Sequence, residues 1–172
     1  MTGTNAPPGS RIERVAGEAM LLAWQHVHNT IIPTAALSLA EVEERSRRNR
    51  LAVAYPGDVV VGCSTVRPPA TGPAAATVIA RVLPAHRGQG CGGQLYAHGP
   101  AEARRLGARV IETCVLESNP EGLRFAVRLG FVETERYVLP FIDGWPDGPQ
   151  SCPGAPAVSP GGRRVRAPSP CH

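Results

Sequence analysis

The stretch VLPAHRGQGCGGQLYAHG, residues 82–99, decides how this sequence can fold. Its first letters close an apolar run typical of a strand, and its last letters open a segment with helical composition. Glycines fill the turn between them, where they permit positive φ angles and keep Cβ atoms away from a bound ligand. The first N–H groups of a helix also attract anions. The stretch therefore predicts a site for a ligand that carries phosphate groups.

Length and composition indicate one soluble α/β domain. The chain has 172 residues, of which 42% are hydrophobic and 19% charged, enough to bury a core without disulfides. The net charge is +4, and all 18 cationic side chains are arginine. Three of these, Arg163, Arg164 and Arg166, lie in a stretch rich in proline and glycine, which favours a solvated tail over a nucleic-acid patch. We expect no nucleic-acid partner.

Cysteine usage and hydropathy predict the compartment. The five cysteines form no CxxC pair and no spacing typical of metal ligands, and their odd number without a signal peptide indicates reduced thiols. No window approaches the ~18 apolar residues that a membrane span requires. We therefore expect a cytoplasmic protein, monomeric or homodimeric, with no membrane partner and no bound metal.

Hydrophobic periodicity predicts the element order β-α-α-β-β-β-α-β-α-β within residues 11–144. Residues 1–10 are expected to be a flexible lead-in and residues 145–172 a disordered tail rich in Pro, Gly and Arg. Strands are expected at 11–15, 50–55, 59–67, 76–83, 109–117 and 131–139, and helices at 17–32, 38–49, 92–108 and 120–130. The central strands should form a hairpin around Pro56-Gly57-Asp58.

Two local signals refine the helices. Ser38 followed by Glu41 matches a capping box, in which each residue satisfies a backbone N–H at the start of a helix. Gly99-Pro100 falls inside the helix that follows the glycine turn and is expected to bend it.

A dinucleotide is the first candidate ligand. Gly88, Gly90 and Gly93 match the G-x-G-x-x-G pattern of nucleotide-binding folds. That pattern normally follows the first strand of a doubly wound sheet, whereas here several strands precede it and too few residues follow it. A P-loop is excluded because no Lys follows the glycines.

Coenzyme A is the second candidate. The subset Arg87-x-x-Gly90-x-Gly92 resembles the pyrophosphate loop of the GNAT superfamily of acyl-CoA-dependent N-acyltransferases. LESNPEGLRFAVRLGF, residues 116–131, is similar to the family's next strand, asparagine and helix. The resemblance covers roughly residues 77–139. It implies a mixed, mostly antiparallel sheet with splayed central strands and flanking helices.

The resemblance also implies where acetyl-CoA would bind. The backbone of Ala80, Arg81 and Val82 would pair with the pantetheine arm as an added strand does. The position of Asn119 matches the family asparagine that contacts pantetheine or orients the neighbouring strand. The pyrophosphate would be held by Arg87 and by the backbone of Gly88, Gln89, Gly90, Cys91, Gly92 and Gly93.

Acyl transfer to an amine then requires a base, an acid and a donor to the thioester carbonyl. The family's carbonyl donor corresponds to the N–H of Val82. Glu112 is the first candidate base, and a solvated strand-end carboxylate is the alternative interpretation. The family's usual Tyr acid is replaced by Ala126. Tyr137 is a possible substitute, although an edge-strand aromatic side chain that packs is the favoured interpretation.

The sequence therefore predicts an acyltransferase that moves an acetyl group from acetyl-CoA to the primary amine of a small molecule in a ternary complex. Two alternatives stay open. One is a non-catalytic CoA-binding regulatory domain, which the missing acid at Ala126 and the weak closing strand after Pro140 both favour. The other is a protein N-acetyltransferase.

Overall fold

The computed structural model describes residues 9–70, 74–138 and 161–167. The chain divides into two compact units, Met1–Glu112 and Thr113–His172. Strand β5, Val110–Leu116, runs from the first unit into the second.

Four antiparallel strands and the start of a parallel one form the sheet of the first unit. The strands β1 (Arg11–Arg14), β2 (Arg50–Tyr55), β3 (Gly62–Arg67) and β4 (Ala75–Val82) pair in sequence order. This confirms the predicted hairpin between β2 and β3.

The parallel ladder between β4 and β5 is short. It joins Ala75–Thr77 to Val110–Glu112, whereas β4 itself continues to Val82. The predicted fold class, a mixed and mostly antiparallel sheet with splayed central strands and flanking helices, agrees with this arrangement.

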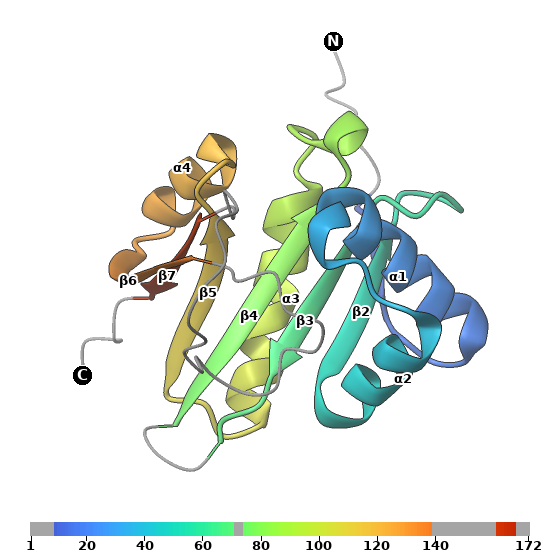
Figure 1. Cartoon of the computed structure of the whole chain (residues 1–172), viewed down its shortest axis with the longest axis horizontal. Helices are drawn as coiled ribbons and strands as arrows, with labels where there is room; N and C mark the ends of the chain where they lie inside the picture. The colour runs from blue at the N-terminus through green and yellow to red at the C-terminus, as the bar shows by residue number, and fades with distance from the viewer. Residues whose placement is uncertain (1–8, 71–73, 139–160, 168–172) are drawn as a thin grey trace, which may run out of the picture. The chain divides into compact units, whose positions relative to one another are not determined.

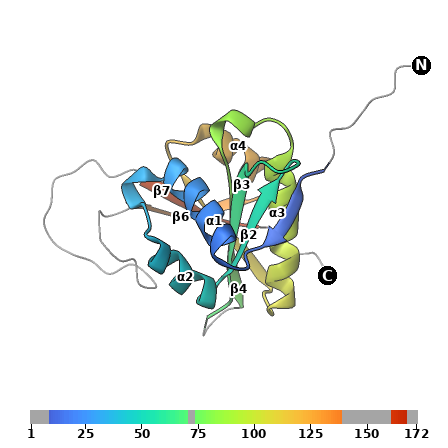
Figure 2. The same ribbon diagram turned by 90° about the vertical axis from the view of Figure 1, so that its right-hand side faces the viewer.

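Helices α1 (Glu18–Ile31) and α2 (Leu39–Arg48) cover one face of this sheet, and α3 (Cys91–Arg105) covers the other (Figures 1 and 2). Each face of the sheet has its own hydrophobic cluster. The cluster on the α1/α2 side consists of Trp24, Val27, Leu37, Val42, Leu51, Val53 and Cys63, and the cluster on the α3 side of Ala54, Val61, Cys91 and Leu95. Alternate residues of β2 thus enter opposite cores, as the period of two in a strand requires.

The capping box predicted at the start of α2 is present. The Glu41 amide donates to the Ser38 hydroxyl at 3.3 Å, and the Ser38 amide donates to the Glu41 carboxylate at 2.7 Å. The hydrogen bonds from the Ser38 hydroxyl and amide lower the pKa of Glu41. A short 3-10 turn, η1 (Pro33–Ala35), separates α1 from α2.

Helix α3 approaches the sheet closely because glycines stand at two of its contact points. A Cβ on Gly62 of β3 would lie 2.7 Å from the Arg81 carbonyl and 2.7 Å from Leu95 Cδ1. A Cβ on Gly99 of α3 would meet the γ-carbons of Val78 in β4. The helix continues through Gly99 and Pro100 to Arg105, in agreement with the helix predicted over residues 92–108.

The second unit contains the rest of β5, α4 (Pro120–Arg128), β6 (Val132–Val138) and β7 (Gly161–Arg166). Strand β7 corrects the prediction of a disordered tail for residues 161–166; the remaining tail residues lie outside the described part, apart from residue 167. β7 pairs antiparallel with β6, and its arginines face acidic residues there: Arg163 lies 3.2 Å from Glu133 and Arg164 3.6 Å from Glu135. Cross-strand charge pairs of this kind stabilise a strand that has little apolar periodicity.

Across the three described segments, no helix is both long and apolar enough to span a lipid bilayer.

The contact of Gly99 with Val78 predicts a stability effect. Gly99→Ala should lower the free energy of unfolding by about 1–2 kcal/mol, because overpacking costs more than the gain in helix propensity. Gly93→Ala is the matched control in the same helix, since a Cβ there meets nothing within 4 Å; it should raise the free energy of unfolding by up to about 1 kcal/mol. Urea denaturation of both variants measures the difference, and equal stabilities would contradict the packing account.

Candidate active site

The glycine-rich turn between β4 and α3 forms an open, side-chain-poor cradle. A short 3-10 turn, η2 (Pro84–His86), leads into it. Gly88 and Gly90 have φ angles of 74° and 84°, in the left-handed region that favours glycine. A Cβ at either position would meet nothing within 4 Å. Their conformation and not crowding explains why glycine stands there.

The N-terminus of α3 faces this turn. Gly90 is the N-cap residue of α3. Because glycine has no side chain, it cannot accept a hydrogen bond from the first amides of the helix. Gln89 and Gly93 are exposed, whereas the thiol of Cys91 is buried in the core beneath α3. These amides, with the positive end of the helix dipole, suit a diphosphate. The chemistry of the cradle therefore fits the pyrophosphate of coenzyme A.

Arg87 has a contact that the sequence does not reveal. Its Nε donates to the Val82 carbonyl at 3.1 Å, so the side chain folds back along the end of β4. The guanidinium is exposed and adjoins the turn. Its charge adds to the attraction of the turn for phosphate.

The backbone at the end of β4 alternates in direction. Leu83 donates to the Val61 carbonyl at 2.8 Å, so the backbone groups of Leu83 and, two residues earlier, Arg81 point toward β3. The N–H and C=O groups of Ala80 and Val82 therefore point away from β3. Of the three residues predicted to pair with pantetheine, Ala80 and Val82 direct their backbone groups away from β3, whereas the Arg81 backbone pairs with β3.

Glu112 lies on the sheet face that α1 and α2 cover. It stands opposite Thr77 in the parallel ladder, and Thr77 stands opposite Arg67 of β3. Residues opposite one another in a ladder direct their side chains to the same face. Arg67, two places from Thr65 and four from Cys63 of the α1/α2 cluster, belongs to that face. Glu112, the predicted base, is 8% exposed.

Arg81 belongs to the same face because it stands opposite Cys63. Its guanidinium hydrogen-bonds to the Cys63 thiol, and burial raises the pKa of that thiol to about 11. Cys63 is therefore a protonated core residue rather than a nucleophile.

His28 of α1 is a buried histidine. Its ring stacks on Trp24, with centroids 5.1 Å apart, and its Nε2 lies 3.0 Å from the Ala35 carbonyl. A carbonyl only accepts, so Nε2 carries the proton and Nδ1 presents a lone pair. Burial first, and then the charge of Arg81, lowers the pKa of His28 to about 4, so the ring is neutral at pH 7.

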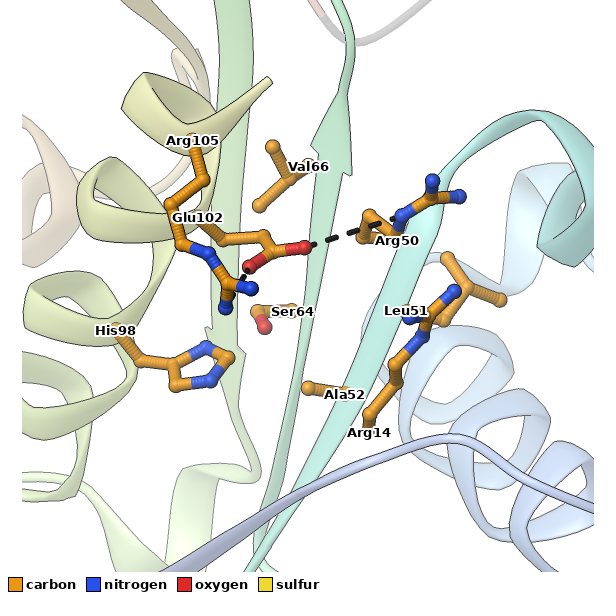
Figure 3. A pocket seen from close by; sticks show the side chains of 9 residues that line it. All are labelled: Arg14, Arg50, Leu51, Ala52, Ser64, Val66, His98, Glu102 and Arg105. Carbon is orange, nitrogen blue, oxygen red and sulfur yellow. Dashed lines mark hydrogen bonds and ion pairs between the residues drawn. The ribbon is translucent and has the colours of Figure 1, made fainter.

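A separate polar pocket of about 200 Å³ lies between β1–β3 and α3 (Figure 3). Its carboxylate, Glu102, lies 3.8 Å from Arg50 and 3.4 Å from Arg105. The charge of Glu102 is therefore balanced by arginines that line the same pocket. It contains none of the turn glycines, and it is smaller than a typical ligand site. Its lining consists of Arg14, Arg50, Leu51, Ala52, Ser64, Val66, His98, Glu102 and Arg105.

In the second unit, Asn119 is the N-cap of α4. Its Oδ1 accepts a hydrogen bond from the Gly122 amide at 3.0 Å, which gives it a structural role in that unit. Ala126, which replaces the family's tyrosine, is buried in α4 and carries no proton to donate. Tyr137 lies on β6 opposite Gly162.

The strand order defines the class of protein as an α/β fold, and its β4–α3 turn and helix N-terminus have a geometry that suits a phosphate-bearing ligand. The sequence matches the family model described as "Acetyltransferase (GNAT) family" over residues 18–131. The chain belongs to the GNAT acetyltransferase family, whose cosubstrate is acetyl-CoA.

Solved structures share the fold at low identity. YncA from Salmonella typhimurium, solved with its cofactor acetyl-CoA, is 21% identical with a TM-score of 0.65, covering 95% of this chain and 99% of its own. A Bacillus subtilis acetyltransferase in complex with CoA is 18% identical, with a TM-score of 0.63 and coverages of 92% and 97%. The ribosomal-protein-S18-alanine N-acetyltransferase from Escherichia coli is 16% identical, with a TM-score of 0.68 and coverages of 95% and 96%. No curated protein matches the sequence.

The buried, neutral His28 predicts a pH dependence of stability. Its pKa in the folded state lies below the ordinary 6.5, so its contribution is complete above pH 6.5 and is lost as the pH falls toward 4. Between pH 7 and pH 5 the loss should be about 2 kcal/mol. Between pH 7 and pH 5, the free energy of unfolding of His28→Gln, measured by urea denaturation, should fall by about 2 kcal/mol less than that of the unaltered chain.

The exposed His26 of the same helix supplies the control. His26→Gln should keep the pH dependence of the unaltered chain. If His28→Gln also kept it, protonation of His28 would not be coupled to unfolding.

Proposed function

We propose that this chain transfers an acetyl group from acetyl-CoA to the primary amine of a small molecule, by direct attack within a ternary complex. The observation that carries the proposal is the glycine turn at the N-terminus of α3, with φ angles of 74° and 84° at Gly88 and Gly90. Membership of the GNAT family supports the acetyl-CoA-dependent chemistry.

Different residues have separate proposed roles in binding acetyl-CoA and in the transfer. Bound acetyl-CoA supplies an acetyl group already activated as a thioester. The turn amides and Arg87 hold the pyrophosphate, and the outward backbone of Ala80 and Val82 aligns the pantetheine arm. The N–H of Val82 polarises the carbonyl that the amine attacks, and this donor stabilises developing negative charge. Holding both reactants together adds to the rate gain through effective molarity.

Proton transfer falls to Glu112 and, in this proposal, to Tyr137. Glu112 accepts the proton of the acceptor ammonium, directly or through water. Tyr137 is proposed to protonate the departing thiolate, because the family's tyrosine position holds Ala126.

A second candidate function rests on Ala126. With a buried methyl group where the family places its acid, a domain that binds acetyl-CoA and performs no transfer is the alternative. A protein acceptor, the third possibility, is the activity named for the similar Escherichia coli structure.

Isothermal titration of the full chain tests the cosubstrate. Acetyl-CoA should bind and NADH should not. Gly90→Glu should weaken acetyl-CoA binding by about 100-fold, because it sets a carboxylate against the phosphates. Gly107→Glu is the matched control, since Gly107 has a comparable φ of 90° with nothing within 4 Å of its Cβ position. Equal losses in both variants would show a general effect of strain and would overturn the assignment of the turn.

Substitution of Glu112 tests the base. Glu112→Gln should lower kcat for acetyl transfer by about 100-fold and leave acetyl-CoA affinity unchanged. Glu117→Gln is the control, because that carboxylate is 50% exposed and lies 2.8 Å from Arg163. Release of CoA, followed with a thiol reagent, measures both. A wild-type chain that binds acetyl-CoA but releases no CoA with any amine or protein acceptor would favour the non-catalytic alternative.

A further inference from the structure

Three arginines converge on the sheet face that α1 and α2 cover. Arg67 and Arg81 reach this face from β3 and β4, as their registers with Thr77 and Cys63 require. Arg45 joins them from α2, where it is half-buried. We name Arg45, Arg67 and Arg81 the arginine cluster. All three belong to the first unit.

The charges of this cluster oppose one another. Burial lowers the pKa of Arg45, and the positive charges of Arg67 and Arg81 lower it further. The Glu41 charge acts the other way and more weakly, and that carboxylate is held by the capping box of Ser38. Within the described part of the chain, neither Arg45 nor Arg67 forms an ion pair. Half-buried like charges repel one another, and a bound anion would reduce that repulsion.

His28 supplies an independent sign of a ligand. It is 4% exposed, and among the described residues its Nδ1 is a buried atom with no hydrogen-bond partner. The charges of all three arginines act on this ring. A buried acceptor without a donor is costly, so a ligand N–H, such as that of an ammonium group, that reaches Nδ1 would be favoured.

The cluster also stands in register with the proposed base. Arg67, Thr77 and Glu112 form one row across three neighbouring strands, with side chains on one face. Strands lie ~4.8 Å apart, so the Cα atoms of Arg67 and Glu112 are about 10 Å apart. A small molecule can therefore place an anionic group against the arginines and an amine beside Glu112.

We infer that the acceptor is a small primary amine that also carries a carboxylate or a phosphate, and that the arginine cluster binds this anionic group. Arginine suits both groups because its guanidinium donates two parallel hydrogen bonds to an oxyanion. This inference rests on the proposed acetyl transfer and adds the class of acceptor.

Matched pairs of amines test the inference on the full chain saturated with acetyl-CoA. Methionine and methioninamide represent the carboxylate, and phosphoethanolamine and ethanolamine represent the phosphate. The charged member of at least one pair should have a kcat/KM about tenfold or more above its neutral partner. The pair that shows the preference distinguishes carboxylate from phosphate.

Variants then assign the preference to the cluster. Arg67→Gln and Arg45→Gln should raise KM for the charged amine by about tenfold or more, and leave KM for its neutral partner and the affinity for acetyl-CoA unchanged. Arg47→Gln, on the same helix but with a side chain 70% exposed, should change nothing. Both cluster variants should also unfold at the same or a higher urea concentration than the unaltered chain, since each removes a like charge.

The outcomes separate the two levels of the account. If acetyl-CoA does not bind, the proposed function fails. If acetyl-CoA binds but the neutral amines react as well as the charged ones, or Arg67→Gln leaves the preference intact, the inference is overturned and the acetyltransferase proposal stands. If neither turnover nor calorimetric binding is found for any charged amine while acetyl-CoA binds, the inference is also overturned.

Discussion

The close packing of α3 on β3 and β4 is the constraint on which the rest of the first unit depends. Gly62 and Gly99 remove the two Cβ atoms that would hold the helix off the sheet, against the Arg81 carbonyl and Val78. With the helix fixed in this way, residues 83–90 must connect the end of β4 to Cys91. Gly88 and Gly90 take left-handed backbone angles in this connection. The anion cradle therefore lies where the chain passes from the sheet to the packed helix.

In the proposed function, the two faces of the sheet have different roles. Helix α3 presents its N-terminus and the turn amides, which suit a phosphate-bearing cosubstrate. Helices α1 and α2 cover the face that holds Glu112 and the arginine cluster, where an acceptor amine would be oriented. Between them, the outward backbone of Ala80 and Val82 in β4 is the element common to both tasks. This division explains why a fold of this kind can keep one cosubstrate and change its acceptor through a few side chains.

Features that depend on neighbours in the sequence could be predicted, whereas features that depend on contacts between distant residues could not. The capping box of Ser38 and Glu41 and the strand–turn–helix at residues 82–99 depend on neighbours in sequence, so they could be read directly. Strand β7 could not, because its stability comes from Arg163 and Arg164 facing Glu133 and Glu135 far away in the chain. The row of Arg67, Thr77 and Glu112 likewise depends on register across two ladders. His28 stands four residues after Trp24, so helical spacing places both on one face of α1, whereas the contact of its Nε2 with the Ala35 carbonyl does not follow from that spacing.

Amide hydrogen exchange with and without acetyl-CoA tests the central claim, that the β4–α3 turn holds the cosubstrate through its backbone. The account predicts that acetyl-CoA slows exchange at residues 88–93 and at the amides of Ala80 and Val82, and leaves α2 unchanged. Binding of acetyl-CoA without slower exchange in the turn, or with slowing confined to the pocket around Glu102, would contradict it.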